Sequence, residues 1–454
     1  MGMRSTTALV LVLLIQLSLG EAATVSNGTT DGKERWGYVE IRPKANLFWW
    51  FYRSSQRVST PEQPWPTILW LQGGPGQSGT GNGNFQEIGA LDVDLKPRNS
   101  TWLQKADLIF VDNPVGVGYS YVEDESALVK TDLEAAADLT ELLKALVKEL
   151  PTLQSSPLFL VGESYDGKLA AMTGVSVARA IRAGTLKITL GGVVLGDSWI
   201  SPDDHALSYP WLLKDVSRLD DNAVGKAIMM AVTVKQQMVS GQFAAAYKTW
   251  VDLLDLIDAK SGNINMENFM VDNTVSSAVL SYLLTRPSSS SPGSSRVAMD
   301  GTNTISGILN GVIKQKLKII PKNITWQDVS LQVFDALTND FMKPAINEAI
   351  DELLSYGVNV TVYQGQLDVI CSTLGTEAWV KRLKWEGLHN FFSLPRKPLH
   401  YCHPYYLTNG FVQSYKNLHF YWILGAGHTV PVDKPCTALY MIGSIVQSPA
   451  SYDG

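Results

Sequence analysis

Short runs of almost uniformly apolar residues recur through the first half of the chain. Each run has four or five residues, carries no charge, and is followed by a glycine or a polar residue. The runs are Thr67–Leu71, Leu108–Val111, Leu158–Val161 and Gly192–Leu195. Such runs are typical of strands that are buried on both faces of a parallel sheet. Two further strands are predicted late in the chain, at Val358–Tyr363 and Leu418–Ile423.

A helix is predicted between the second and third of these strands. The segment Thr131-Asp-Leu-Glu134 has the form of a capping box, in which two side chains satisfy backbone N–H groups at a helix start. Leucines then repeat at helical spacing as far as Leu150, and Pro151 is expected to end the helix. A helix between two strands indicates a βαβ crossover, so this part of the chain is predicted to be of the α/β class.

The pattern changes after Trp199. Between about Ser201 and Ala345 no pair of strands is predicted, and helices are expected at Asn222–Ser240 and Phe243–Asp258. Residues 286–296 are rich in serine and proline, which is typical of a flexible surface loop and compatible with a protease-nicking site. We therefore expect one mostly parallel central sheet flanked by helices, built from residues 24–200 and 346–454 and interrupted by a helical insertion at 201–345.

Composition and charge limit the classes of partner. The 454 residues include 45% hydrophobic and 18% charged residues, which is ordinary for a globular protein with a large core. The formal net charge of −6 argues against nucleic acid as a partner, because no surplus of basic side chains is present to neutralise phosphates.

The first residues have the features of a secretory signal. Arg4 precedes an apolar run from Ala8 to Leu19, and the small residues around Gly20 and Ala23 suit cleavage, so residues 1–23 are predicted to be removed. A signal anchor is the alternative, but the run is short for a membrane span. No other segment is long and apolar enough to cross a bilayer, so we expect a secreted or lysosomal protein without a membrane span.

Sequons and cysteines fit passage through the secretory pathway. Four sequons for N-glycosylation begin at Asn27, Asn99, Asn323 and Asn359, the last of them inside a predicted strand. The chain has 3 cysteines, so at most one internal disulfide can form. We favour Cys402–Cys436 with Cys371 free, although the sequence leaves the other pairings open.

A candidate nucleophile follows one of the predicted strands. Ser164 lies in Gly162-Glu-Ser-Tyr, directly after the strand Leu158–Val161 and before a stretch that is compatible with a helix. A strand, a sharp turn and a helix form the setting of a nucleophile elbow, which needs small residues two positions before and after the serine. Gly162 meets this requirement, whereas Asp166 departs from it.

A serine hydroxyl needs a base, and the base needs an orienting acid. Of the six histidines, only His428 follows an apolar strand at a glycine-bounded turn. Asp368 lies just beyond another predicted strand and falls between Ser164 and His428, as the order of an α/β-hydrolase triad requires. For the oxyanion hole we predict the backbone N–H groups of Tyr165 and Gly74, the latter in the glycine-rich segment after Thr67–Leu71.

Five motifs together resemble the serine carboxypeptidase family. In chain order they are Trp70-Leu-Gln-Gly-Gly-Pro-Gly, Asp112-Asn-Pro-Val-Gly-Val-Gly-Tyr-Ser-Tyr, Gly162-Glu-Ser-Tyr, Gly365-Gln-Leu-Asp and Gly427-His-Thr-Val-Pro. The segment Glu377-Ala-Trp-Val-Lys-Arg-Leu-Lys-Trp looks similar to the retinoid-inducible branch of that family. The resemblance implies an α/β-hydrolase fold with a helical cap, and removal of single residues from peptide C-termini at acidic pH. We predict no cofactor and no metal ion.

The resemblance also implies residues that bind the substrate's C-terminal carboxylate. The family's motifs map this role onto Gln72, Gly73, Glu87 and Glu163, with glutamine standing where the family usually has asparagine. If Glu87 and Glu163 are adjacent, their repulsion keeps a proton on one of them, and that proton can be donated to a carboxylate. The resemblance therefore implies that substrate binding weakens as pH rises.

Two other functions stay open at this stage. An acyltransferase or esterase on the same scaffold would keep Ser164, Asp368 and His428 but would not need Glu87 and Glu163 together. A catalytically weak secreted binding protein is the other alternative, since a charged Asp166 could distort the elbow.

Overall fold

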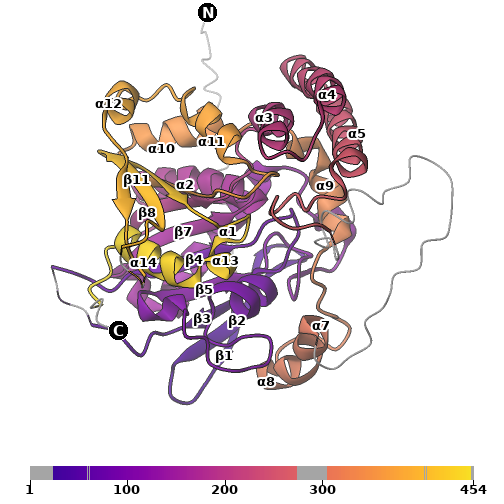
Figure 1. Cartoon of the computed structure of the whole chain (residues 1–454). Coiled ribbons are helices and arrows are strands. Elements are labelled where there is room, and N and C mark those ends of the chain that lie inside the picture. The colour runs from indigo at the N-terminus through magenta and orange to yellow at the C-terminus, as the bar shows by residue number, and fades with distance from the viewer. Residues whose placement is uncertain are drawn as a thin grey trace, which may run out of the picture.

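One large sheet organises the molecule (Figure 1). The computed structural model describes residues 24–273 and 304–450, apart from positions 59, 61, 403 and 405. The predicted signal peptide at 1–23 and the serine-rich segment at 286–296 lie outside the described residues. Across the described residues the strands are β1 (Thr24–Gly28), β2 (Glu34–Arg42), β3 (Ala45–Tyr52), β4 (Thr67–Leu71), β5 (Asp107–Val111), β6 (Tyr121–Val122), β7 (Pro157–Glu163), β8 (Thr189–Gly196), β9 (Val360–Gly365), β10 (Lys397–Leu399), β11 (Gly410–Tyr415) and β12 (Leu418–Ile423).

The centre of the sheet is parallel and its edges are antiparallel. The strand order is β1-β2-β3-β5-β4-β7-β8-β9-β12-β11-β10, and β6 pairs with β3. Each neighbouring pair from β5 to β12 runs parallel. The prediction of an α/β fold with a mostly parallel central sheet is confirmed. The six predicted strands all belong to this parallel part.

Side chains of successive strand residues enter two separate cores. In β3, Leu47, Trp49 and Phe51 pack into one hydrophobic cluster. Phe48, Trp50 and Tyr52 pack into the other. This alternation follows from the two-residue period of a strand, and it requires helices on both faces of the sheet.

The two cores are covered by different helices. The first core receives α1 (Asp132–Glu149) and α2 (Tyr165–Arg182). The second receives α14 (Pro435–Ile445) and residues of α8 (Lys314–Leu317). The N-terminus of α1 is capped by Thr131 Oγ1, which accepts a hydrogen bond from the Glu134 N–H at 3.2 Å. The predicted cap of this helix is confirmed.

A helical insertion separates two adjacent strands, β8 and β9 (Figure 1). The helices that the structure describes in it are α3 (Pro202–Asp215), α4 (Asp221–Val239), α5 (Phe243–Ser261), α7 (Ile305–Ile308), α8 and α9 (Leu331–Phe341). The two helices predicted from spacing correspond to α4 and α5, with ends displaced by at most three residues. Phe341 of α9 and Trp250 of α5 pack against Trp199 at the end of the sheet, so aromatic contacts attach the insertion to the core.

The remaining helical segments are short. They are η1 (Gly79–Ile88), η2 (Trp102–Gln104), η3 (Glu125–Ala127), η4 (Pro151–Gln154), η5 (Leu309–Ile313), η6 (Ile346–Asp351), α10 (Glu352–Ser355), α11 (Thr373–Val380), α12 (Leu388–Ser393) and α13 (Val430–Asp433). Cys402 and Cys436 form a disulfide, and Cys371 is free and buried, as predicted. The disulfide joins the segment after β10 to α14.

One strand boundary was predicted wrongly. Asn359 does not lie inside a strand, because β9 begins at Val360. Gly357, with φ of 76°, turns the chain after α10, and only two residues then remain before the strand. The side chain of Asn359 is exposed, and its amide donates a hydrogen bond to the Gly191 carbonyl at 3.1 Å.

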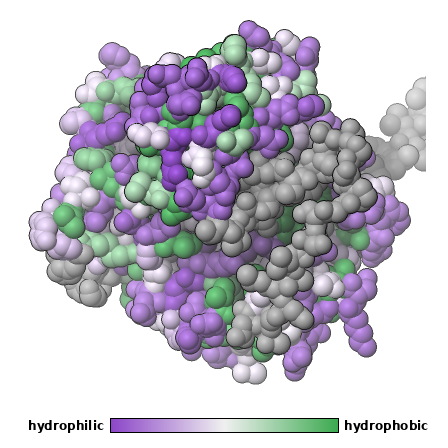
Figure 2. Space-filling model, turned by 45° about the vertical axis from the view of Figure 1, so that its right-hand side comes forward, coloured by the Kyte–Doolittle hydropathy of each residue, from purple (hydrophilic) through white to green (hydrophobic). Residues whose placement is uncertain are grey.

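The outer surface is mainly hydrophilic on the face that Figure 2 shows, with hydrophobic side chains scattered between polar ones. In the part of the chain that the structure describes, no helix combines the length and the apolar character needed to cross a membrane.

Candidate active site

Ser164 lies on a strained turn between β7 and α2. Its φ of 57° and ψ of −128° are uncommon for a residue with a side chain, and they are the mark of a sharp strand-to-helix turn. A Cβ added to Gly162 would lie 2.1 Å from the Asp166 carbonyl oxygen. A Cβ added to Gly167 would lie 1.9 Å from Ser198 Oγ. The backbone at 162 lies against the Asp166 carbonyl, and the backbone at 167 lies against Ser198, so both positions require glycine. Position 166 has room for a side chain.

Asp166 fits into this turn without displacing the serine. Its side chain is fully buried, and Asn113 Nδ2 donates a hydrogen bond to Asp166 Oδ2 at 3.3 Å. Burial raises the pKa of Asp166 well above its ordinary value. Ser164 keeps the dihedral angles of a sharp strand-to-helix turn and α2 begins at Tyr165, so the expected distortion of the elbow is not found. The raised pKa also favours the neutral form of Asp166, which would not repel a carboxylate.

Buried ionic contacts hold the first turn of α2. Tyr165 Oη donates to Asp132 Oδ1 at 2.6 Å, and Lys168 Nζ pairs with Asp132 Oδ2 at 2.6 Å. Lys168 Nζ also donates to the Asp340 carbonyl in α9 at 2.7 Å. These contacts join the helix that follows Ser164 to α1 and to the helical insertion.

Asp368 and His428 meet at the carboxyl ends of two adjacent strands. Asp368 follows β9 and His428 follows β12, and ends of neighbouring parallel strands lie at one edge of a sheet. His428 Nδ1 lies 2.8 Å from Asp368 Oδ2. Asp368 is fully buried, and its Oδ1 accepts a hydrogen bond from the Cys371 N–H at 3.1 Å. Both carboxylate oxygens of Asp368 therefore have a hydrogen-bond partner.

The helical insertion contacts the loops that carry this pair. The Glu267 carbonyl accepts a hydrogen bond from the His428 N–H at 2.8 Å. The Met266 carbonyl accepts from Val369 and Ile370, at 3.0 and 2.9 Å, directly after Asp368. These contacts, in which Glu267 supplies a backbone oxygen, were not predicted from the sequence.

The charge state of His428 depends on several carboxyl groups. Burial lowers its pKa, but the hydrogen-bonded Asp368 carboxylate, with Glu267 and Asp197 nearby, outweighs burial and raises the pKa of His428 to about 10. The imidazole is thus stabilised in its charged form as long as these acids are ionised.

The glycine-rich segment after β4 lies against the serine. A Cβ added to Gly73 would be 2.5 Å from Ser164 Cβ and 3.1 Å from Ser164 Oγ, so only glycine fits there. Gly74 has φ of 117°, a conformation that side chains rarely adopt. Tyr165 is the first residue of α2, where a backbone N–H has no helical carbonyl to bond. Among the described residues, no hydrogen bond joins Ser164 Oγ to His428.

Glu87, Glu163 and Gln72 form a buried cluster beside this segment. Gln72 Nε2 donates to Glu87 Oε1 at 2.8 Å and to Glu163 Oε1 at 3.3 Å. Trp70 Nε1 donates to Gln72 Oε1 at 2.8 Å and so fixes the orientation of the amide. The Oε2 atoms of both glutamates are buried and have no partner within the described protein. A proton on either Oε2 atom can therefore be donated to the other glutamate or to a ligand that enters the cluster.

Burial and mutual repulsion favour a proton on one of the two glutamates. Burial raises the pKa of Glu163 well above its ordinary value, and the neighbouring Glu87 raises it further. Burial also raises the pKa of Glu87, although its hydrogen bonds oppose that effect. These effects together favour protonation of Glu163 more strongly than protonation of Glu87. The predicted adjacency of the two side chains is what the structure shows.

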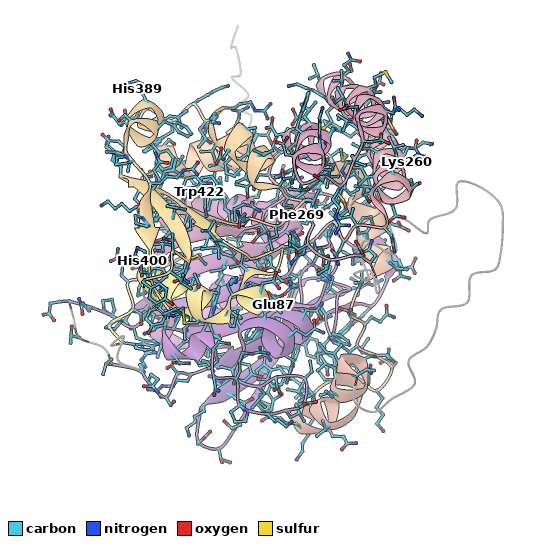
Figure 3. The ribbon with its side chains drawn as sticks, viewed as in Figure 1. Glu87, Lys260, Phe269, His389, His400 and Trp422 are labelled. Carbon is cyan, nitrogen blue, oxygen red and sulfur yellow. A yellow bond between two sulfur atoms is a disulfide. The ribbon has the colours of Figure 1, made fainter. Side chains whose placement is uncertain are left out.

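The other histidines described lie in different surroundings. In Figure 3 Glu87 and Phe269 are near the middle of the molecule, whereas His389 and His400 lie toward one side. Both of these histidines are exposed. His205 is buried, and burial lowers its pKa to about 4. It stacks on Trp199, which is a structural contact.

A thiol completes a group of possible metal ligands. Asp368, Cys371 and His428 place ligand atoms within 4.8 Å of one another. Burial, followed by the Asp368 charge, raises the pKa of the Cys371 thiol well above its ordinary value. Metals bind the thiolate, so this protonated thiol makes a poor ligand.

A match to a protein-family model assigns the chain to a family. The model described as serine carboxypeptidase matches residues 25–448. The chain belongs to the serine carboxypeptidase family. It is 52% identical to serine carboxypeptidase-like 51 of Arabidopsis thaliana, over 97% of this chain and 98% of that protein. It is 42% identical to the human retinoid-inducible serine carboxypeptidase, over 96% of each chain.

The fold has a solved counterpart. The crystal structure of Kex1(delta)p, a prohormone-processing carboxypeptidase from Saccharomyces cerevisiae, matches with a TM-score of 0.74 and 20% identity, over 91% of each chain. The predictions of a serine-type carboxypeptidase and of an α/β-hydrolase fold are confirmed at the level of the family and the fold. The binding-protein and esterase alternatives are not favoured.

Two side chains near the site of this serine carboxypeptidase were not predicted from the sequence. Asp197 and Gln364 are fully buried next to Asp368. Asp197 lies just after the end of a strand at the same edge of the sheet as Asp368 and His428, and that shared position is the signal that could have revealed it.

Proposed function

We propose that this serine carboxypeptidase releases C-terminal residues from peptides through an acyl-enzyme formed on Ser164. The observation that carries the proposal is the buried glutamate pair beside the serine. Gly73 contacts Ser164, and Gln72, the residue before it, holds Glu87 and Glu163 by hydrogen bonds. A buried, protonated acid with a free oxygen is suited to bind a carboxylate, and a carboxylate is what distinguishes a chain end from an internal peptide bond.

The chemistry is divided among five groups. Ser164 Oγ attacks the last peptide carbonyl, and His428 takes the hydroxyl proton and gives it to the leaving amine. Asp368 holds His428 at 2.8 Å and stabilises the imidazolium. The N–H groups of Tyr165 and Gly74 stabilise the oxyanion. Water then attacks the ester while His428 takes a proton from it, and His428 gives that proton to Ser164 Oγ as the acid product leaves. Ser164 and His428 form their hydrogen bond on substrate binding, as is common for catalytic contacts.

The glutamate pair gives the enzyme an acidic preference. Below the raised pKa of Glu163, its carboxyl group donates a hydrogen bond to the substrate carboxylate. Above that pKa, Glu163 becomes a second negative charge next to Glu87, and substrate is repelled. A charged imidazole cannot accept the Ser164 proton, so the rate should also fall as pH decreases. Because the neighbouring carboxylates raise the pKa of His428, activity in acid requires that substrate binding or protonation of these carboxyl groups lowers that pKa.

Substrates that differ only at the chain end test this function. A blocked dipeptide with a free C-terminus should be hydrolysed in acid, and its C-terminal amide should be cleaved about 100-fold more slowly or worse, since the amide has no negative charge to bind. Ser164→Ala should abolish both reactions. Equal rates for acid and amide would refute the carboxylate site, and activity in Ser164→Ala would refute the nucleophile.

We also propose that the protein is a secreted or lysosomal glycoprotein. Asn27, Asn99, Asn323 and Asn359 are exposed, which glycosylation requires. Asn359 is the weakest acceptor, because its amide nitrogen donates to the Gly191 carbonyl. Mass spectrometry of the protein from a eukaryotic host should find glycans on the other three asparagines and a mature N-terminus near Thr24. An intact N-terminus and bare asparagines would contradict the proposal.

A further inference from the structure

Asp197 is a strained and fully buried acid next to the proposed catalytic pair. It follows Gly196, the last residue of β8, and its φ of 41° is unusual for a residue with a side chain. Its backbone N–H donates to the Tyr363 carbonyl in β9 at 3.0 Å, so the two strand ends are held together. Buried strain of this kind persists where the surrounding structure imposes it, and it gathers at functional sites.

A single amide bridges Asp197 and Asp368. Gln364 Nε2 donates to Asp197 Oδ1 at 2.7 Å and lies 3.3 Å from Asp368 Oδ2, the atom that also receives His428. Gln364 Oε1 accepts from Thr376 Oγ1 at 2.7 Å, which turns the NH₂ group toward the two acids. The carboxyl groups of Asp197 and Asp368 therefore both lie within hydrogen-bonding distance of one nitrogen atom, Gln364 Nε2.

The hydrogen bonds of the two acids are unequal. Asp368 is supplied by His428 Nδ1 and by the Cys371 N–H. Asp197 Oδ1 receives two donors, Gln364 and the Gly365 N–H at 2.7 Å. Asp197 Oδ2 is buried and receives no donor in the described structure. Two adjacent buried carboxylates cannot both stay ionised, and an oxygen without donors is the place for the proton.

Electrostatics favour the same assignment. Burial, followed by the Asp368 charge, raises the pKa of Asp197 well above its ordinary value. The titratable groups that act on Asp197 or His428 come from several elements: Asp368, Cys371, Glu163, Glu87, Glu267, His205 and Tyr363. If Asp197 were ionised, its charge would join those of Asp368 and Glu267 and keep His428 protonated. A base that must act in acid needs fewer such charges.

We propose that Asp197 is a positioning residue of the active site: its protonated carboxyl group donates a hydrogen bond to Asp368 and holds that carboxylate in place for His428. This inference rests on the proposed roles of Asp368 and His428. The donated hydrogen bond spreads the charge of Asp368 and so limits how strongly Asp368 holds a proton on the imidazole. Asp197 thereby helps His428 to be neutral at acidic pH.

Two substitutions at Asp197 separate this role from simple packing. Asp197→Asn keeps a neutral hydrogen-bond donor, and asparagine tolerates the positive φ. Asp197→Gly also tolerates that φ but removes the donor. The measurement is kcat/KM against pH for a free-carboxylate dipeptide, whose acid limb reports the pKa of the base in the free enzyme.

The proposal predicts different profiles for the two variants. Asp197→Asn should stay within about threefold of the parent, with the same acid limb, because its amide replaces the carboxylic acid. Asp197→Gly should lose about tenfold or more, and its acid limb should move up by about half a pH unit or more, because Asp368 then holds the His428 proton more strongly. A loss of rate without movement of the acid limb would mean a structural role only, and would overturn the proposal.

The opposite protonation state has its own signature. If Asp197 is ionised, Asp197→Asn removes a negative charge and the acid limb moves to lower pH. Infrared difference spectra of the parent against Asp197→Asn give a second readout that survives a misfolded glycine variant. They should show the band of a protonated carboxyl group in the parent, and its absence would overturn the proposal. Ser164→Ala is assayed alongside as a control. Residual activity in Ser164→Ala would mean that the proposed function has failed, whereas an inactive Ser164→Ala lets the Asp197 variants be interpreted on their own.

Discussion

Glu163 connects two parts of the site through its position in the chain. It is the last residue of β7 and therefore directly precedes Ser164 on the strained turn. Its side chain points to Gln72 and Glu87, and the residue is only 1% exposed to solvent. Because Glu163 directly precedes Ser164, a change in its protonation state alters the surroundings of the proposed nucleophile as well as the proposed carboxylate-binding cluster.

Replacement of Glu163 by glutamine should remove most of the pH dependence of binding. Glutamine stays neutral and can donate at every pH. In the parent, kcat/KM for a free-carboxylate peptide should fall by about tenfold per pH unit above the pKa of Glu163, whereas in Glu163→Gln it should change by less than about threefold over the same range.

The control for this prediction is Glu386→Gln. Glu386 is exposed and pairs with Lys416, so its substitution should leave the pH profile as it is in the parent. Parallel alkaline limbs in the parent and in Glu163→Gln would contradict the assignment of the binding proton to Glu163.

At the scale of elements, the turn between β7 and α2 sets the geometry of the site. The turn tolerates Asp166, whose side chain reaches Asn113, but it leaves no space for a Cβ at Gly162. The sequence pattern of a nucleophile elbow predicts small residues at both 162 and 166, and the structure requires one only at 162. The reason is that the second close approach is made by Gly167 against Ser198, one position later than expected.

Substitution of Gly162 by alanine should move the serine. The new Cβ would lie 2.1 Å from the Asp166 carbonyl oxygen, so the turn must open. We expect a loss of about 1 to 3 kcal/mol in the free energy of unfolding. A displacement of the nucleophile by about 1 Å should cost about 100-fold in kcat.

The matched control is Gly225→Ala in α4, where an added Cβ meets nothing within 4 Å. That variant should be more stable by about 0.5 to 1 kcal/mol and fully active, because alanine is the better helix former. If Gly162→Ala had the activity of Gly225→Ala, the account of the elbow would be wrong.

The parallel core of the fold could be predicted because each of its strands leaves a local signal. Apolar runs such as Thr67–Leu71 need no knowledge of their neighbours, and the polar residues that follow them mark the edge where Asp368 and His428 meet. The contacts between the Glu267 segment and that edge could not be predicted, because they depend on how a separate helical insertion folds back. Asp197 was missed because a lone aspartate after a strand usually faces solvent.

At the scale of the whole molecule, the buried acids predict how stability varies with pH. Burial raises the pKa values of Asp112, Glu163, Asp166 and Asp197 above their ordinary values. An acid that binds its proton more tightly when folded stabilises the fold most below its unfolded pKa, near 4, and that contribution is lost as pH rises toward the folded pKa.

One buried group opposes this trend on the acid side. Burial lowers the pKa of His205 to about 4, so its contribution to stability is lost as pH falls from about 6.5 to about 4. Stability should therefore be greatest in mild acid, and the free energy of unfolding should fall by about 2 kcal/mol or more between about pH 5 and about pH 8. Thermal unfolding across this range measures the change. A melting temperature that is constant or rises toward pH 8 would contradict the prediction.

The central claim is that Ser164 is an activated nucleophile, and covalent labelling tests it most directly. A fluorophosphonate reacts with a serine hydroxyl only where a base and an oxyanion site support the attack. Peptide mapping of the labelled protein should find a single adduct, on the peptide that contains Ser164, with carboxypeptidase activity lost in proportion to labelling and no adduct in Ser164→Ala. An active protein that stays unlabelled, or an adduct on another serine that abolishes activity, would contradict the account.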